Sequence, residues 1–285
     1  MIAGLLGGLA GLFCLYLFLV APCLHRGKAP PGALIGQRYF AHRGLHDDSV
    51  PENSLAAFRM AAVKGYGIEW DVHLSRDGKM FVFHDFSLLR MCGVDRLISD
   101  MTEEEIRVCR LQGGSEGIPS LDEALKTVNG RVPLIIEMKA DGKLWDTALA
   151  QKLFDRMQSY PGRWCVESFD PFLVRWYKKH APDIVRGQLA YDPRYAGEKR
   201  SLIYHLAARL FFNFLSRPHF IAYGWEGDRN ASLRLMRALF RPVMAAWTVR
   251  TPQASKDLQN RYDAQIFEAF DPSTNPKEPV FEEKE

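Results

Sequence analysis

Short apolar runs alternate with longer amphipathic stretches along most of the chain. Short runs of this kind are typical of buried strands, and stretches with a helical period between them are typical of helices. The predicted strands are Tyr39–His42, Ile68–His73, Met80–His84, Leu134–Lys139, Cys165–Phe169, Val185–Ala190, Phe220–Tyr223 and Val243–Val249. The predicted helices are Ser54–Lys64, Ser120–Val128, Leu144–Ser159, Pro171–His180, Ala231–Phe240 and Pro252–Asn260.

This alternation predicts an α/β protein with a parallel sheet. Eight such strands in succession predict a closed (β/α)8 TIM barrel. A Rossmann fold is the alternative, but no GxGxxG follows the first strand. We place the barrel at residues 36–271, after a linker at 25–35 that contains two adjacent prolines, and before a flexible tail at 272–285 that is rich in Pro and Glu.

The most apolar stretch is the N-terminal segment 1–24, which lacks Asp, Glu, Lys and Arg. As a helix that rises ~1.5 Å per residue, this segment would extend about 36 Å, more than the ~30 Å hydrocarbon core of a bilayer. We therefore predict an uncleaved, single-pass transmembrane anchor. A cleaved signal peptide is the alternative, but it requires a basic region before the apolar run.

Charge beside this segment sets its predicted orientation. Basic residues between positions 26 and 38 follow the segment and no basic side chain precedes it, so the positive-inside bias places the C-terminal bulk of the chain in the cytoplasm. Two overlapping GxxxG pairs, Gly4 with Gly8 and Gly7 with Gly11, would allow a dimer through helix–helix contact in the bilayer. The alternative is that these glycines reflect only the high glycine content of membrane helices.

A second apolar stretch, Lys199–Phe220, mixes Leu, Ile and Phe with Lys and Arg. It is too polar to span a membrane. Its pattern predicts an amphipathic helix that lies in a membrane interface. The alternative is an ordinary outer helix of the barrel.

Composition and charge narrow the class of partner. The chain has 285 residues, and 37 Lys and Arg against 34 Asp and Glu give a net charge of +3. A charge this small does not indicate binding to nucleic acid. Five cysteines without a CxxC pair indicate neither a disulfide framework nor a zinc site, and they fit a reducing compartment.

Charged and titratable side chains gather where the first four predicted strands end: His42, Arg43, Glu69, Asp71, His84, Glu137 and Lys139. The active sites of barrel enzymes lie at this end of the strands. Three carboxylates on adjacent strands form an all-oxygen ligand set, which suits Ca²⁺ or Mg²⁺ better than Zn²⁺. Two histidines beside such a metal suit acid–base catalysis near neutral pH, and two cations suit an anionic substrate. The combination predicts cleavage of a phosphate diester.

Short motifs follow one another in a fixed order along the same region. They are Ala41-His42-Arg43-Gly44, Pro51-Glu52-Asn53-Ser54, Ile68-Glu69-Trp70-Asp71-Val72, Ser75-Arg76-Asp77-Gly78, Phe83-His84-Asp85, Ile118-Pro119-Ser120-Leu121, Ile136-Glu137-Met138-Lys139, Ser168-Phe169 and Trp247-Thr248-Val249. Together they resemble the glycerophosphodiester phosphodiesterase family between Arg38 and Phe270. With the N-terminal segment, the chain resembles a membrane-anchored, bacterial-type member of that family.

The resemblance implies a (β/α)8 barrel that binds one divalent metal ion, Ca²⁺ or Mg²⁺, with Mn²⁺ as a further candidate. It implies Glu69, Asp71 and Glu137 as the metal ligands. It also implies His42 and His84 as the catalytic acid–base pair.

The resemblance further implies how a glycerophosphodiester would be cleaved to glycerol phosphate and an alcohol. Arg43 and Lys139 would hold the phosphate, and Trp247 is predicted to line the glycerol pocket. The glycerol hydroxyl next to the phosphate attacks phosphorus, and the resulting cyclic phosphate is then hydrolysed. One histidine takes the proton of the nucleophile and the other protonates the leaving alcohol; we predict His42 as the first base. Glu52 is expected either to orient a histidine or only to begin a helix.

Other functions stay open at this point. A lysophospholipid or a phospholipid headgroup diester becomes the expected substrate if Lys199–Phe220 lies in a lipid bilayer. A phospholipase C-like enzyme on inositol lipids shares the barrel and the two histidines, but the Glu-Asp…Glu set favours the diesterase family. A catalytically inactive, membrane-anchored binding protein is the last alternative. Such a protein is expected to lack one of the two catalytic histidines or one of the three metal ligands, and this chain has all five residues.

Overall fold

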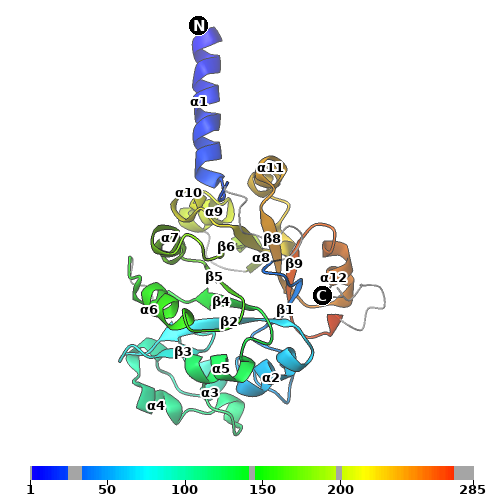
Figure 1. Cartoon of the computed structure of the whole chain (residues 1–285). Helices are drawn as coiled ribbons and strands as arrows, with labels where there is room; N and C mark the ends of the chain where they lie inside the picture. The colour runs from blue at the N-terminus through cyan, green and yellow to red at the C-terminus, as the bar shows by residue number, and fades with distance from the viewer. Residues whose placement is uncertain (1, 25–33, 141–144, 197–200, 273–285) are drawn as a thin grey trace.

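The strands form one sheet that closes on itself (Figure 1). The structure is a computed structural model, and it describes residues 2–24, 34–140, 145–196 and 201–272. Its strands are β1 (Tyr39–His42), β2 (Gly67–Leu74), β3 (Met80–Val82), β4 (Leu134–Met138), β5 (Trp164–Ser168), β6 (Arg186–Ala190), β7 (Phe220–Gly224), β8 (Val243–Val249) and β9 (Ala264–Phe267). Its helices are α1 (Ile2–Val20), α2 (Leu55–Val63), α3 (Leu89–Cys92), α4 (Glu103–Arg107), α5 (Leu121–Val128), α6 (Ala148–Met157), α7 (Pro171–His180), α8 (Pro193–Ala196), α9 (Leu202–Ala208), α10 (Asn213–Ser216), α11 (Ala231–Phe240) and α12 (Pro252–Leu258).

Eight parallel strands make the barrel, in the order β1-β2-β4-β5-β6-β7-β8-β9, and β9 pairs with β1 to close it. This confirms the predicted (β/α)8 TIM barrel. The eight strands are not, however, the eight that the sequence indicated. The predicted strand Met80–His84 ends at Val82 and pairs antiparallel with β2, outside the barrel. The closing strand β9 was missed, because Ala264–Phe267 is short and contains a polar residue.

Alternate side chains of the barrel strands fill its interior: Phe40, Ile135, Cys165, Leu189, Phe220, Ala222, Ala245, Ala264 and Ile266. Leu34 and Ile35, which the sequence analysis assigned to the linker, are buried in the same cluster. The rest of the predicted linker, residues 25–33, lies outside the described residues, and so does nearly all of the predicted tail, residues 273–285.

The other face of each strand packs against the surrounding helices. Trp70 and Ile136 belong to this outer core, because side chains alternate between the two faces along β2 and β4. Most helices begin within a residue of the predicted start, whereas α6 begins at Ala148 rather than at Leu144. Ser120 and Glu123 form a capping box at the start of α5, where each side chain accepts a hydrogen bond from the backbone N–H of the other residue.

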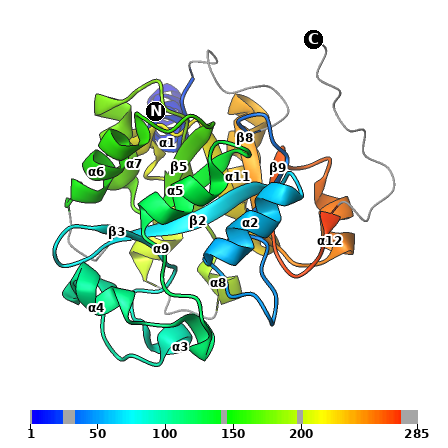
Figure 2. The ribbon, with the colours of Figure 1, turned by 60° about the horizontal axis from the view of Figure 1, so that its bottom comes forward.

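The hairpin of β2 and β3 opens an insertion that lies at the end of the molecule opposite α1 (Figure 1). Figure 2 shows α3 and α4 of this insertion together beneath β3. The insertion has an apolar core of its own, which includes Phe83, Leu88, Met91, Ile98 and Ile106. It is therefore a compact addition to the barrel rather than an extended loop.

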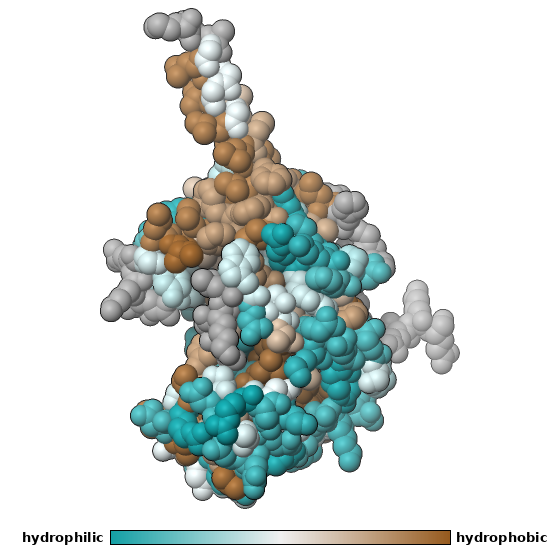
Figure 3. All heavy atoms as spheres, turned by 90° about the vertical axis from the view of Figure 1, so that its left-hand side faces the viewer, coloured by the Kyte–Doolittle hydropathy of each residue, from teal (hydrophilic) through white to brown (hydrophobic). Residues whose placement is uncertain are grey.

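Helix α1 packs its last turns against the barrel. The Tyr16 ring lies edge-on to Phe211, with the ring centroids 5.6 Å apart, and the Tyr16 hydroxyl donates to Ser232 Oγ at 2.7 Å. The Asn213 amide donates to the carbonyl of Val20 at 2.9 Å, and Val20 is fully buried. Figure 3 shows that the hydrophobic surface of α1 continues onto the part of the barrel beneath it.

These contacts explain a correction to the sequence analysis. Among the described residues, none of the helices is both long enough and apolar enough to cross a membrane. The predicted transmembrane anchor at 1–24, and the single-pass membrane location with a cytoplasmic catalytic domain that depended on it, are therefore wrong. The helix ends at Val20 rather than Leu24, and its end is fixed to the barrel through the Asn213 amide. The predicted pairing through Gly4/Gly8 or Gly7/Gly11 depended on the same segment and has no support here.

The stretch Lys199–Phe220 forms α9, α10 and the start of β7 rather than one long amphipathic helix; residues 199 and 200 lie outside the described part. Phe211 faces Tyr16, and the Phe214 ring lies 6.0 Å from that of Phe18. Two of the phenylalanines expected to meet lipid are therefore covered by α1. The segment connects β6 with β7, as an ordinary outer layer of the barrel does.

Replacing Asn213 with alanine is expected to loosen α1 from the barrel. The buried amide is a hydrogen-bond donor to the end of this helix, and loss of such a partner costs about 1–3 kcal/mol. Limited proteolysis and hydrogen exchange of residues in α1 measure the effect. Gln253→Ala, an exposed change on α12, is the control and should leave α1 as protected as in the parent protein. Equal protection of α1 in Asn213→Ala and the control would contradict this account.

Candidate active site

Three buried carboxylates meet at the mouth of the barrel. Glu69 and Asp71 lie on the same face of β2, and Glu137 on β4 stands directly beside Asp71 in the strand register. Oxygen atoms of the three side chains lie within 4.8 Å of one another, and the residues are 2%, 0% and 7% exposed. An all-oxygen set of this size could hold one divalent cation. The structure thus brings together the three residues that the sequence grouped.

Positive charge inside the triad comes from Lys139, whose Nζ lies 2.8 Å from Asp71 Oδ1 and 2.7 Å from Glu137 Oε1. Burial acts to raise the pKa of Asp71, but Lys139, His84 and Arg43 hold it well below its usual range. Burial and the charge of Asp71 raise the pKa of Glu69 well above its usual range. Burial and crowding thus oppose the ionisation of Glu69 beside Asp71, and a divalent cation would relieve this repulsion. The all-oxygen donor set fits such a cation.

His42 ends β1 with its ring between two carboxylates. Nδ1 lies 2.5 Å from Glu268 Oε2, and Nε2 lies 4.0 Å from Glu69 Oε2. Burial lowers the pKa of His42 to about 4, although Glu268 acts in the opposite direction. A ring with this pKa is neutral near pH 7. Glu268, in contrast, stays ionised, because the hydrogen bond to His42 and the charge of Arg250 outweigh its burial and lower its pKa to about 2.

His84 reaches the same mouth by a different route. The β2–β3 hairpin turns the chain back, so that the Phe83 N–H donates to the carbonyl of Asp71 at 3.0 Å. His84 Nδ1 then lies 2.6 Å from Asp85 Oδ1, and the imidazole is one-third exposed. Its backbone carbonyl lies 3.2 Å from Nε2 of His73, which is buried. The prediction that His84 ends a barrel strand was wrong, although its place at the mouth was right.

Arg43 follows His42 with a φ of +56°, a left-handed conformation that turns its backbone N–H to Glu69 Oε2 at 3.2 Å. Its guanidinium donates to Glu52 at 2.9 Å, and Nε lies 3.7 Å from Asp71. The buried Asn53 amide donates to Asp71 Oδ2 at 2.9 Å. Glu52 and Asn53 therefore contact the site, beyond their place before α2.

Arg90 of α3 was not singled out from the sequence. Its guanidinium donates to Glu52 and, through Nε at 2.6 Å, to Asp85. It thereby connects the residue beside His84 with the residue beside Arg43. No sequence pattern signals this role, because surface arginines in short helices are common and usually pair locally.

Trp247 stands at the mouth end of β8, with Phe169 and Tyr191 beside it. The ring centroids of Phe169 and Tyr191 lie 5.6 Å and 5.9 Å from that of Trp247. The indole Nε1 is buried, and within the described part of the chain it has no hydrogen-bond acceptor. An apolar wall with one available donor thus forms one side of the mouth.

A fourth carboxylate, Glu167 on β5, lies directly beside Glu137 in the strand register and is 1% exposed. Burial, together with the charges of Glu137 and Asp71, raises its pKa well above the usual range. Glu167 was not predicted from the sequence, because it precedes the Ser168-Phe169 motif and belongs to none of the motifs itself.

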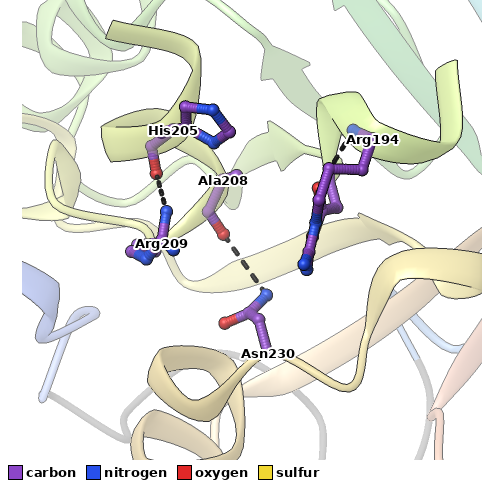
Figure 4. Close-up of a pocket in the computed structure, with 6 residues that line it drawn as sticks. Arg194, His205, Ala208, Arg209 and Asn230 are labelled. Atoms are coloured by element: carbon purple, nitrogen blue, oxygen red, sulfur yellow. Dashed lines mark hydrogen bonds and ion pairs between the residues drawn. The ribbon is translucent and has the colours of Figure 1, made fainter. Parts of the chain in front are cut away.

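A small cavity of about 110 Å³, whose lining includes none of the site residues described above, lies between α8, α9 and the start of α11 (Figure 4). Arg194, His205, Arg209 and Asn230 line it. Arg194 is paired with Asp192, and Asn230 donates to the Tyr223 hydroxyl, so these two side chains already serve the local structure. The sequence-predicted residues take no part in it.

Comparison with known proteins gives one consistent family. The model of the glycerophosphoryl diester phosphodiesterase family matches residues 42–266. A glycerophosphodiester phosphodiesterase of Caldanaerobacter subterraneus subsp. tengcongensis is 34% identical over 161 residues, which cover 52% of this chain and 65% of that protein. One of Bacillus altitudinis is 30% identical over 165 residues, which cover 54% of this chain and 67% of that protein. The aligned part thus spans about two thirds of each relative.

Solved structures agree with the fold. A glycerophosphodiester phosphodiesterase of Thermotoga maritima superimposes with a TM-score of 0.63 at 25% identity, covering 81% of this chain and 94% of that one. A phosphodiesterase of Oleispira antarctica, in complex with the product sn-glycerol-3-phosphate, gives a TM-score of 0.65 at 22% identity and covers 81% of this chain and 92% of its own.

Proposed function

Because the chain belongs to the glycerophosphoryl diester phosphodiesterase family, we propose that it hydrolyses glycerophosphodiesters to glycerol phosphate and an alcohol. The observation that carries the proposal is the meeting of three buried carboxylates and two histidines at one barrel mouth. Each histidine has a carboxylate on Nδ1, which leaves Nε2 available for proton transfer.

Glu69, Asp71 and Glu137 would hold one divalent cation, Ca²⁺ or Mg²⁺, with Mn²⁺ as a third candidate. Such a cation supplies positive charge to the phosphoryl oxygens when it is bound. Arg43 and Lys139 lie beside the carboxylates and would attract the phosphate group from the protein side.

The proposed reaction needs two proton transfers in each step, one from the attacking oxygen and one to the leaving oxygen. In the first step the glycerol hydroxyl next to the phosphate gives its proton to one histidine and bonds to phosphorus. The bond from phosphorus to the leaving oxygen breaks, and the other histidine gives a proton to that oxygen. Water then opens the cyclic phosphate to glycerol phosphate, with the two histidines in exchanged roles. His42 is the proposed first base, because its buried ring is held neutral and Nε2 faces the carboxylate site.

Trp247 would line the pocket for the glycerol or the leaving group. Its wall with Phe169 and Tyr191 offers an apolar face, and its indole N–H is buried and available to an oxygen of the substrate. This supports the role that was expected from the sequence.

The direct test is hydrolysis of glycerophosphoethanolamine by the purified full chain with Ca²⁺, Mg²⁺ or Mn²⁺. We expect ethanolamine and glycerol phosphate to appear in equal amounts. The His42→Ala protein, purified in the same way, controls for contaminating hydrolases. Absence of product with every cation, from protein that is folded, would overturn the proposal.

A lysophospholipid is the second candidate substrate. A lysophospholipase D of Rattus norvegicus is 29% identical over 136 residues, which cover 43% of this chain and 41% of that protein. The aromatic wall beside the mouth is the structural feature that an acyl chain would contact. Comparing kcat/KM for lysophosphatidylcholine and glycerophosphoethanolamine decides between the two classes, and a preference for the small diester is the expected result.

A further inference from the structure

The strand pairing that closes the barrel brings Glu268 to His42. Phe40 pairs with Ile266, and Ala41 pairs with Phe267. One step further along both strands sets Glu268 beside His42. Phe40 and Ile266 both point into the barrel interior, so the residues two positions later point to the same side, at the mouth.

Both oxygens of the Glu268 carboxylate are occupied. Oε2 lies 2.5 Å from His42 Nδ1, and Oε1 accepts a hydrogen bond from Arg250 Nε at 2.5 Å. The backbone N–H of Glu268 donates to the carbonyl of Val249 at 3.0 Å. Val249, the last residue of β8, therefore holds the backbone of Glu268, and Arg250 directly after it holds the carboxylate.

The contact determines which ring nitrogen of His42 carries the hydrogen. An ionised carboxylate only accepts hydrogen bonds, so Nδ1 must be the donor. Nε2 then carries the lone pair, and it is the nitrogen nearest to Glu69 of the acidic triad. His46 Nε2 lies 3.9 Å from the same Glu268 oxygen, so the much shorter contact is the one to His42.

We propose that Glu268, held by Arg250, is the positioning residue of His42: it fixes the Nδ1–H tautomer and aims Nε2 at the carboxylate site. The expected effect of Glu268 on catalysis rests on the proposed function, because it requires that His42 transfers a proton. His84 has an equivalent partner in Asp85, its neighbour in the sequence, whereas the partner of His42 comes from the opposite end of the chain.

The first experiment measures the tautomer without turnover. The imidazole ¹⁵N signals of His42, assigned by their absence in His42→Gln, should show a protonated Nδ1 in the full-length protein at neutral pH. In Glu268→Ala we expect a mixture of tautomers. Wild-type protein with its hydrogen on Nε2 would overturn the proposal, and so would an unchanged tautomer in folded Glu268→Ala.

The second experiment measures kinetics on glycerophosphoethanolamine. Glu268→Ala should lower kcat by about 10- to 100-fold, the usual scale for a lost orienting partner, with KM nearly unchanged. Glu268→Gln retains an acceptor oxygen and should recover part of the loss. Arg250→Ala, an exposed change, should lower kcat less than Glu268→Ala, and Glu104→Gln on α4 is the matched control with no effect.

The two experiments separate the possible failures. If the protein hydrolyses no glycerophosphodiester but the tautomer changes as expected, the proposed function fails and the role of Glu268 stands. If hydrolysis is normal and both Glu268→Gln and Arg250→Ala match the wild-type kcat and tautomer while Glu268→Ala does not fold, Glu268 is structural only and the inference fails.

Discussion

Replacement of His42 with alanine is expected to lower kcat by about 10²-fold or more, the scale of a positioned acid or base. The His42 ring lies between Glu268 and the acidic triad. The change therefore removes Nε2, the ring nitrogen that faces Glu69. KM should change little, because the groups proposed to hold the phosphate, Arg43 and Lys139, remain. His84→Ala is expected to have an effect of similar size.

Steady-state kinetics with glycerophosphoethanolamine measure the loss, and circular dichroism checks that the variants fold. His180→Ala is the matched control, because His180 is exposed on α7 and, within the described part of the chain, its ring forms a hydrogen bond only with the carbonyl of Trp176. We expect this control to keep the parent kcat. A His42→Ala protein with a kcat close to that of the parent would show that His42 does not transfer the proton.

Removal of divalent metal is the second change with a large expected effect. Chelation should abolish hydrolysis, and Ca²⁺, Mg²⁺ or Mn²⁺ should restore it. The reason is the crowding of the triad: burial and the charge of Asp71 raise the pKa values of Glu69 and Glu137, so the three carboxylates are not fully ionised together without a cation. A bound divalent cation would offset this repulsion and supply positive charge to the phosphate.

Binding can also be measured without catalysis. A cation that binds the folded state alone raises Tm in proportion to the logarithm of its concentration. Asp71→Asn preserves the shape of the side chain but removes one charge, and it should reduce both this shift and kcat. Glu103→Gln on α4, outside the triad, should leave both unchanged. Full activity after exhaustive chelation would contradict the metal assignment.

The residues of the site that could be predicted from the sequence are those in short local patterns. Glu69 with Asp71, and Glu137 with Lys139, are two positions apart on one strand, so alternation alone placed each pair on a common face. Glu268 lies 226 residues from His42, and only the closure of the barrel brings them together. No spacing rule along the chain could reveal that pair without the register of β1 and β9.

The same limit explains the error at the N-terminus. Hydropathy measures how long an apolar run is, but it does not reveal which part of the run has a partner in the folded chain. Ser232, Asn213 and Phe211, all more than 190 residues from α1 in the sequence, contact its last turns or the residue at its end. Composition alone therefore predicts a membrane span for α1, because it does not take these contacts with the barrel into account.

The two histidines depend on different cooperative units of the fold. His42 sits on the barrel wall, whereas His84 follows a hairpin whose continuation has an apolar core of its own. Regions with separate cores open independently and at different free energies. Opening of the insertion would withdraw His84 and Arg90 from the mouth, while Glu69, Asp71 and Glu137 stayed on barrel strands. The denaturant concentration at which activity is lost would then measure the stability of whichever unit opens first. The concentration at which cation binding is lost would measure the stability of the barrel.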